Sequence, residues 1–285
     1  MDHLSTIRLQ GTSARNASRC GRARGFTLVE AVIVIAVTGI IAAVVAVFIQ
    51  RPIQAYFDTA RRAELTDVAD TALRRLSREL HLALPNSVRV TSAGGVSYLE
   101  FLQTSGGGRY RAALDNAGAG NVLDVSQSIT SFDVLGPPAA TVPGAQNLVV
   151  VYNQGVAGAD AYAGDNSSTI NTVSGNTVSI AAKQFPFASP ASRFQIVSYP
   201  VTYACDPTAQ TLTRFWNYSI TAAQPTGFKA GTASALLAKY VTACSFTYDA
   251  NVVAQRAGVV ATALQLTQSG ESVNLYHEVH VSNVP

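Results

Sequence analysis

Apolar residues dominate the chain between Phe26 and Gln50. These 25 residues contain one formal charge, Glu30, and their few other polar positions are uncharged. About 20 apolar residues in a helix are enough to cross the hydrocarbon core of a bilayer. The pattern therefore predicts a membrane-spanning helix with a carboxylate near its start.

A second helical pattern follows this apolar segment. Apolar residues recur there at spacings of three and four, which places them on one helix face. They are Leu65, Val68, Ala69, Ala72, Leu73, Leu76, Leu80 and Leu84. Pro85 should end the helix and Pro52 should kink it, because proline lacks the N–H that continues the hydrogen-bond ladder. We expect one long, bent helix over residues 26–84, with its second half packed on a globular head.

Residues 85–285 have a strand-like pattern. Short runs rich in valine, isoleucine and aromatic residues are bounded there by glycine, asparagine or proline, as strands are. The runs are Ser97–Gln103, Leu148–Asn153, Thr177–Ala181, Phe194–Ala204, Thr211–Ile220, Val259–Thr267 and Val273–Val281. Turn residues at 206–209 and 268–271 predict two hairpins. The predicted fold class is α+β, with the long helix packed on an antiparallel sheet.

Two segments of the head, 104–121 and 153–176, are rich in small and polar residues and are predicted to be exposed loops. Gly106–Gly108 lacks the Gly-Lys-Ser/Thr sequence of a phosphate-binding loop, so a flexible turn is the better interpretation. Asp160, Asp165 and Asn166 offer oxygen ligands, but their spacing matches no defined calcium loop. Ligand or calcium binding by these loops stays an open question.

Positive charge gathers before the apolar segment. The arginines there are Arg8, Arg15, Arg19, Arg22 and Arg24, against the single acidic residue Asp2. The positive-inside rule then places residues 1–25 in the cytoplasm and the chain after Gln50 on the other side of the membrane.

The boundary between the basic and apolar segments carries a specific motif. Residues 22–30 read Arg-Ala-Arg-Gly-Phe-Thr-Leu-Val-Glu, which resembles the type IV prepilin signal. The resemblance implies that a prepilin peptidase cleaves between Gly25 and Phe26 and methylates the new amine of Phe26. It also implies that Glu30 pairs with the terminal amine of a neighbouring subunit during assembly. Such pairing would offset the roughly 2.5–3.5 kcal/mol that a charged side chain costs in hydrocarbon.

The simpler alternative is a signal-anchor helix with an incidental glutamate. An ordinary signal peptide has a shorter apolar core and a small-residue cleavage site after it, and no clear site of that kind precedes Gln50. The prepilin resemblance divides the chain into a cleaved leader (1–25), a membrane-spanning or filament-core half-helix (26–50), an amphipathic half-helix (51–84) and a periplasmic, β-rich head (85–285). It implies a single-pass protein of the bacterial inner membrane that later enters a filament or its tip.

Leader removal changes the charge of the chain. The full sequence has 20 basic and 17 acidic residues; without the five arginines and one aspartate of the leader, 15 basic and 16 acidic residues remain. A nucleic-acid-binding surface would need clustered basic residues in the folded part. The local clusters, at Arg61–Arg62 and within 74–78, interleave with acidic residues such as Glu79 and predict a solvated helix face. No nucleic acid is expected as a partner.

Two cysteines remain once Cys20 leaves with the leader. Cys205 and Cys244 are then exported to an oxidising compartment, where we expect them to form a disulfide. Closing a loop of that length would stabilise the fold by about 3–4 kcal/mol on the chain-entropy model. The alternative is a pair of buried free thiols.

Catalytic groups are sparse after processing. The remaining histidines are His81, His277 and His280, and the chain has no Gly-x-Ser-x-Gly or His-Glu-x-x-His motif. In the last predicted strand His277 and His280 point to opposite faces, so they cannot hold one metal together. We therefore predict no catalytic residue, no metal and no cofactor, and no enzymatic function.

The head has its own resemblance. Residues 78–90 and 275–285, with the cysteine hairpin at 203–214, resemble minor pilins of the mannose-sensitive haemagglutinin (MSHA) pilus, the MshO family. PilW-type minor pilins are relatives of that family. The resemblance implies a low-abundance subunit that primes or caps pilus assembly. Its partners would be prepilin peptidase, other minor and major pilins, the inner-membrane assembly platform and the lipid bilayer.

Two alternative functions remain open at this stage. A J-like minor pseudopilin of type II secretion would share Gly25, Phe26, Glu30 and a large sheet-rich head. A stand-alone, membrane-anchored periplasmic binding protein or adhesin would instead keep its leader. The sequence does not identify the head surface that contacts other subunits.

Overall fold

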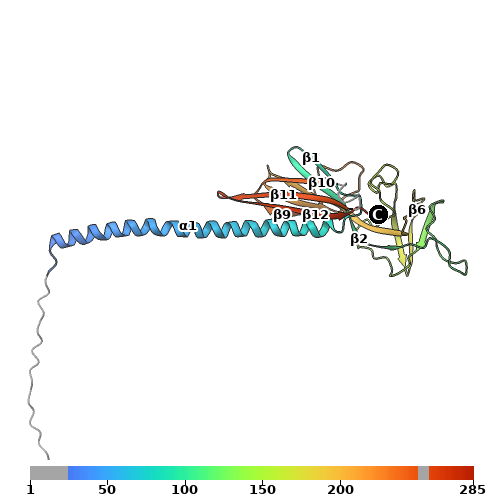
Figure 1. Ribbon diagram of the computed structural model, residues 1–285, viewed down its shortest axis with the longest axis horizontal. Coiled ribbons are helices and arrows are strands. Elements are labelled where there is room, and N and C mark those ends of the chain that lie inside the picture. The colour runs from blue at the N-terminus through green and yellow to red at the C-terminus, as the bar shows by residue number, and fades with distance from the viewer. Residues whose placement is uncertain (1–24, 250–256) are drawn as a thin grey trace, which may run out of the picture. The chain divides into compact units, whose positions relative to one another are not determined.

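The computed structural model describes residues 25–249 and 257–285 (Figure 1), so most of the predicted leader lies outside the described residues. Its long helix, α1 (Leu28–Leu80), covers both predicted helical patterns and includes Pro52. Residue contacts divide the chain into two compact units, one ending at Tyr56 and the other being Phe57–Pro285. The kink at Pro52 stays a prediction.

The helix ends four residues earlier than its pattern predicts. It stops at Leu80, and the next residues bond to strand β2 (Val96–Arg109) instead of continuing the helix. The Leu84 N–H donates to the Leu102 carbonyl at 2.8 Å, and the Thr104 N–H donates to the Leu82 carbonyl at 2.8 Å. Pairing with β2 thus takes the place of the last predicted helical turn, while Leu84 stays fully buried.

The apolar face predicted for the second half of the helix is confirmed. Most of its members are buried within the second unit, and Val68 is partly buried against the same core. The buried ones are Leu65, Ala69, Ala72, Leu73, Leu76, Leu80 and Leu84. All of these except Leu84 share one core with Phe101 and Tyr203 from one sheet and Leu264 from another. Leu84 lies in a smaller cluster with Leu102 and Val197. The α+β class is therefore right, and the helical period locates its main core.

The strands form two antiparallel sheets rather than one. The larger sheet has nine strands in the order β1-β2-β7-β4-β5-β6-β3, with β8 on β7 and β9 on β8, and the smaller has the order β10-β11-β12. Besides β2, the strands are β1 (Arg89–Ala93), β3 (Ile129–Asp133), β4 (Leu148–Val150), β5 (Ser167–Ser174), β6 (Thr177–Lys183), β7 (Arg193–Asp206), β8 (Thr211–Trp216), β9 (Ala233–Lys239), β10 (Val241–Asp249), β11 (Ala257–Gln268) and β12 (Glu271–Ser282). The chain changes sheet at Tyr240, whose φ of 62° turns it between β9 and β10.

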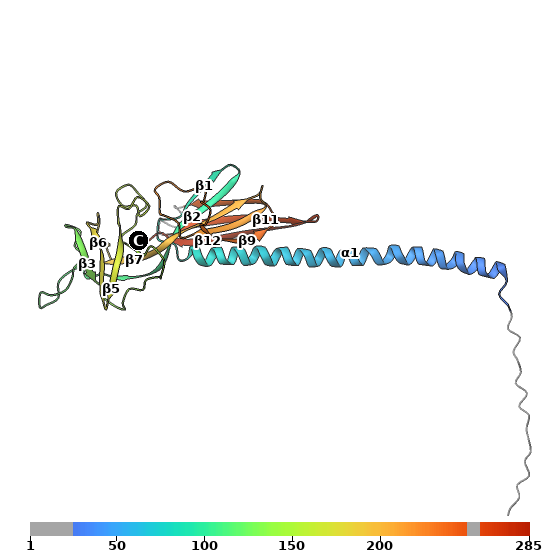
Figure 2. The ribbon, with the colours of Figure 1, turned by 180° about the vertical axis from the view of Figure 1, so that it is seen from behind.

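Strands β2 and β7 run the length of the head. Their paired halves nearer α1 contribute to the helix core, whereas their other halves meet a second core built on β3, β4 and β6. Figure 2 shows β3, β5 and β6 gathered at the end of the head away from β1 and β11. Among the described residues, the larger sheet therefore contributes to three apolar clusters, the third of which is smaller and includes Leu102, Val150 and Val197.

The glycine run at 106–108 corrects one prediction. It lies inside β2, not in a flexible turn, and pairs with β7. A Cβ on Gly107 would come within 2.6 Å of the Phe194 carbonyl oxygen, and one on Gly108 within 3.2 Å of the Phe194 ring. Glycine is needed here because β7 and its aromatic side chain approach the β2 backbone closely.

Other strand boundaries differ for local reasons. The predicted loop 153–176 contains β5, while β4 and β8 end sooner than predicted because Tyr152 and Asn217 adopt positive φ angles of 52° and 56°. The two predicted hairpins are confirmed: β7 pairs with β8, and β11 pairs with β12. The sequence did not predict β1, β3, β9 or β10.

Candidate processing and assembly site

The helix begins two residues after the predicted cleavage bond. Residues 25–27 are not helical, and α1 starts at Leu28. The Thr27 carbonyl accepts the Ala31 N–H at 3.1 Å, and the Thr27 hydroxyl oxygen accepts the Glu30 N–H at 3.2 Å. Thr27 is thus the N-cap of α1, because its side chain satisfies an amide that has no partner within the helix.

The residues on either side of the predicted cleavage bond are exposed on this non-helical stretch. Phe26 is 71% exposed, and a Cβ built on Gly25 would meet no atom within 4 Å. Gly25 also lacks the positive φ that would demand glycine. The chain's own fold therefore gives no reason for glycine at this position, and a requirement for it must come from the enzyme that reads the motif.

Glu30 lies in the first turn of α1 among exposed apolar side chains. Its neighbours Leu28 and Val29 are 81% and 65% exposed. Among the described residues α1 is long and apolar enough to cross a membrane, and none of its most apolar stretch is buried inside the chain. A carboxylate at this place needs a positive partner once the surrounding surface enters lipid or a filament. The role of Glu30 in assembly stays a prediction.

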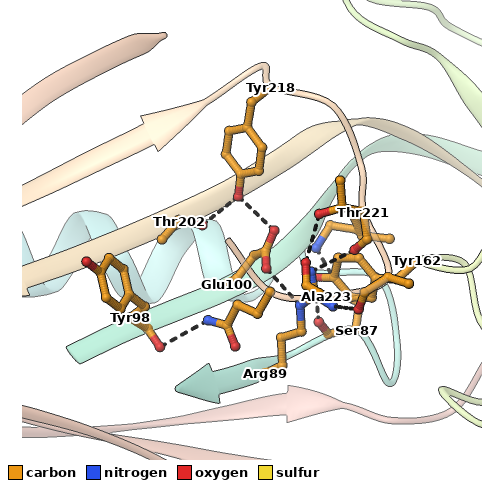
Figure 3. Close-up of polar contacts among 12 residues, drawn as sticks. Ser87, Arg89, Tyr98, Glu100, Tyr162, Thr202, Tyr218, Thr221 and Ala223 are labelled. Carbon is orange, nitrogen blue, oxygen red and sulfur yellow. Dashed lines mark hydrogen bonds and ion pairs between the residues drawn. The ribbon is translucent and has the colours of Figure 1, made fainter. Parts of the chain in front are cut away.

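The head contains a buried ion pair at the centre of a polar network (Figure 3). Arg89 on β1 and Glu100 on β2 are directly opposed in register, and Nε of Arg89 lies 2.7 Å from Oε2 of Glu100. Tyr218 donates its hydroxyl to Oε1 of Glu100 at 2.8 Å. The other Arg89 nitrogens donate to the carbonyls of Thr221 and Ala222. The network thereby fastens the segment after β8 to the β1–β2 hairpin.

Burial is the main cause of the pKa shifts of Glu100 and Tyr218 in this network. Glu100 is completely buried, and desolvation raises the pKa of its carboxyl, while the Arg89 hydrogen bond and charge act in the opposite direction. Burial and the nearby Glu100 charge also raise the pKa of Tyr218, which keeps this phenol a neutral donor. The carboxylate oxygens are both engaged by donors within the chain, an arrangement that indicates a structural role.

A second network joins the helix end to the main sheet. Oε2 of Glu79 accepts hydrogen bonds from Nε of Arg214 at 2.6 Å and from the Tyr203 hydroxyl at 2.8 Å, and Oε1 accepts from Arg75 at 3.1 Å. Arg214 is buried. The prediction of a solvated face is therefore wrong for Glu79, because β7 and β8 bring a phenol and a guanidinium against that side of the helix.

Cys205 and Cys244 are joined by a disulfide, the pairing expected from the sequence. Their Cα atoms are 6.4 Å apart, and the bond connects β7 of the larger sheet to β10 of the smaller one. Cys205 is fully buried beside the helix core. The bond therefore links the two sheets whose apolar side chains share a core with one face of α1.

Replacing both cysteines, Cys205→Ala with Cys244→Ala, should lower the free energy of unfolding by about 2–4 kcal/mol, because the unfolded chain gains the entropy of an open loop. Chemical denaturation followed by the fluorescence of Trp216, the chain's one tryptophan, measures the change. Parental protein in excess reductant should lose a similar amount. A loss below about 1 kcal/mol in both experiments would contradict a stabilising bond.

The remaining candidate ligands are dispersed. In β12, His277 is partly buried on the side of Val279, whereas His280 is exposed on the other side, as the strand alternation predicts. Within residues 25–249 and 257–285, no group of three or more histidine, cysteine, aspartate or glutamate side chains is placed to hold a metal ion. The Asp165 carboxylate accepts the Gly158 N–H at 2.8 Å and the Asp160 N–H at 3.3 Å, so it shapes its own loop.

Comparison with known proteins identifies the N-terminal segment. Residues 20–46 match the prokaryotic N-terminal methylation motif. The match covers the predicted cleavage bond, Glu30 and the start of α1. The N-terminal segment is therefore type IV prepilin-like. No curated protein and no solved structure matches the chain. The comparisons therefore bear on the N-terminal segment, and the head is interpreted from its own structure.

The motif and the fold agree on a pilin or pseudopilin type of protein, and they favour a structural, non-enzymatic role. The motif implies processing by prepilin peptidase and assembly with other pilins. The long apolar helix fits a single-pass inner-membrane anchor. The candidate site is thus the segment from Gly25 to Glu30, which the matched motif covers.

Thr27 is the member of this site that the sequence analysis missed. A threonine followed three residues later by glutamate, just before an apolar run, is the signature of a helix N-terminus called a capping box. Thr27-Leu28-Val29-Glu30 has that pattern. The signal was present in the sequence, but the membrane-length hydropathy pattern placed the helix start at Phe26.

Proposed function

We propose that this chain is a minor pilin of an MSHA-like type IV pilus that primes or caps pilus assembly. The observation that carries the proposal is the methylation motif at residues 20–46, placed at the start of a membrane-length helix. The resemblance of residues 78–90 and 275–285 to the MshO family supports the narrower assignment. A head larger than is needed to cover one helix favours a minor subunit over a densely packed major one.

In this proposal prepilin peptidase cleaves between Gly25 and Phe26 and methylates Phe26. The N-terminus is cytoplasmic and the head periplasmic before assembly, as the basic leader predicts. The subunit then leaves the bilayer for the filament through the inner-membrane assembly platform, with other minor and major pilins as partners. Glu30 of one subunit neutralises the Phe26 amine of its neighbour.

The close alternative is a J-like minor pseudopilin of type II secretion, which the same motif supports. A pulldown of the detergent-solubilised protein, analysed for pilus or secretion components, separates the two. A stand-alone binding protein or adhesin is the alternative of another class. It keeps its leader, and so differs in the mass of its N-terminus.

The variant Gly25→Ala should impair leader removal and leave the fold unchanged, because Gly25 has open space at its Cβ position and no positive φ. Mass spectrometry should find N-methyl-Phe26 at the start of the parental protein and an excess of uncleaved chain in the variant. Equal unfolding midpoints would show that the defect is one of recognition. A parental protein that begins upstream of Phe26 would overturn the proposed processing.

A further inference from the structure

Thr27 is the second residue after the predicted scissile bond, and it caps the N-terminus of α1, which begins at Leu28. We propose that its hydroxyl is a positioning group for leader removal: by capping α1, it keeps the Gly25–Phe26 peptide non-helical and open to the peptidase. This inference rests on the proposed processing of the chain and assigns a role to a residue between the cleavage bond and Glu30.

The hydrogen bonds show how the cap acts. If α1 extended by one more turn, the Glu30 N–H would donate to the Phe26 carbonyl and the Val29 N–H to the Gly25 carbonyl, following the i to i−4 pattern. In the structure the Glu30 N–H donates to the Thr27 hydroxyl oxygen instead, at 3.2 Å. The cap therefore removes a donor that extension through the cleavage site would use.

The reaction explains why the helix must stop there. Hydrolysis adds water across the Gly25–Phe26 bond, so the Gly25 carbonyl carbon is attacked and the products are a Gly25 carboxylate and a Phe26 ammonium. A carbonyl inside a helix is already hydrogen-bonded and flanked by neighbouring side chains. Thr27 caps α1 just after this bond, so the scissile peptide lies outside the helix.

The competing explanation is that the peptidase recognises the shape of threonine directly. The two explanations predict different rankings of variants. Thr27→Val keeps the branched shape and loses the acceptor, whereas Thr27→Ser and Thr27→Asn keep a capping oxygen and change the shape. A matched control is Thr38→Val, which makes the same chemical change in the same helix at a hydroxyl that donates to the Val34 carbonyl at 2.6 Å.

The test follows the rate of cleavage of the full-length precursor in detergent by purified prepilin peptidase. We expect Thr27→Val to slow cleavage by roughly two- to thirtyfold, the range that loss of an N-cap produces. Serine and asparagine should restore most of the rate, and Thr38→Val should cleave like the parent. In the uncleaved precursor, the Glu30 amide should exchange with solvent faster in Thr27→Val than in Thr27→Ser.

The outcomes separate the inference from the function on which it rests. Cleavage of the parental chain with equal rates for all Thr27 variants, or with valine fast and asparagine slow, would overturn the cap and leave the proposed processing standing. An uncleaved parental chain would overturn both. Unchanged exchange of the Glu30 amide in Thr27→Val would contradict the cap, whatever the cleavage rates.

Discussion

Glutamine in place of Glu30 should leave leader removal intact and lower incorporation into filaments by at least about tenfold. The carboxylate lies in the first turn of a helix whose surrounding side chains are apolar and exposed. A neutral amide cannot pair with the positive amine of a neighbouring Phe26. Two opposite charges about 4 Å apart attract by roughly 4 kcal/mol at an effective dielectric constant of about 20, enough for a loss of this size.

Glutamine is the informative replacement because a capping box accepts either glutamate or glutamine three residues after the N-cap. The Thr27 cap should therefore survive in Glu30→Gln, and any assembly defect reports the lost charge. Immunoblots of sheared filaments measure incorporation, and mass spectrometry of the membrane fraction measures cleavage. Glu64→Gln, at another exposed glutamate of α1, is the matched control. Normal incorporation of Glu30→Gln would refute the pairing.

Patterns with a regular period were predicted well. The spacing of Leu65, Ala69, Leu76 and Leu80 identified the buried face of α1, because one helical face was covered by the head. The two hairpins were also predicted correctly, because the turn residues at 206–209 and 268–271 mark them locally in the sequence. Strand β9 was missed because its sequence, Ala-Ser-Ala-Leu-Leu-Ala-Lys, has little strand propensity. Its pairing with β8, a tertiary contact, determines its conformation.

The polar and motif residues described above also differ in how well the sequence predicts them. Gly25, Phe26 and Glu30 form a contiguous motif that a sequence displays directly, and the methylation-motif match covers all three. The Thr27 cap also has a local signature, but a hydropathy average does not detect where a helix stops. The polar network of Arg89 and Glu100 had no readable signal, because it depends on the register of β1 against β2 and on a distant segment after β8.

Replacing Arg89 with methionine should destabilise the head by about 3–5 kcal/mol. The change keeps most of the apolar stem and leaves the completely buried Glu100 carboxylate without its cation, which is the costly way to break a buried pair. It also frees the carbonyls of Thr221 and Ala222. Denaturation followed by Trp216 fluorescence measures the loss.

Glu100→Gln distinguishes the cost of the stranded charge from the loss of a contact. In that background Arg89→Met no longer leaves a buried anion, so its cost should fall, and a double-mutant cycle gives the difference as the coupling energy. Equal costs of Arg89→Met with and without Glu100→Gln would refute the argument. So would a single-mutant loss below about 1 kcal/mol.

The pH dependence of Arg89→Met follows from the same pair. Burial already raises the pKa of Glu100 above its ordinary value of 4.5, and Arg89 is the main group that opposes the rise. Without Arg89 the folded-state pKa rises further. A carboxyl with a raised folded-state pKa penalises the fold where it is ionised, at neutral pH, and the penalty shrinks as the pH falls through that pKa. The stability gap between parent and variant should therefore be widest near pH 7 and narrow toward pH 4.5, because protonation of Glu100 removes the buried charge that Arg89 neutralises.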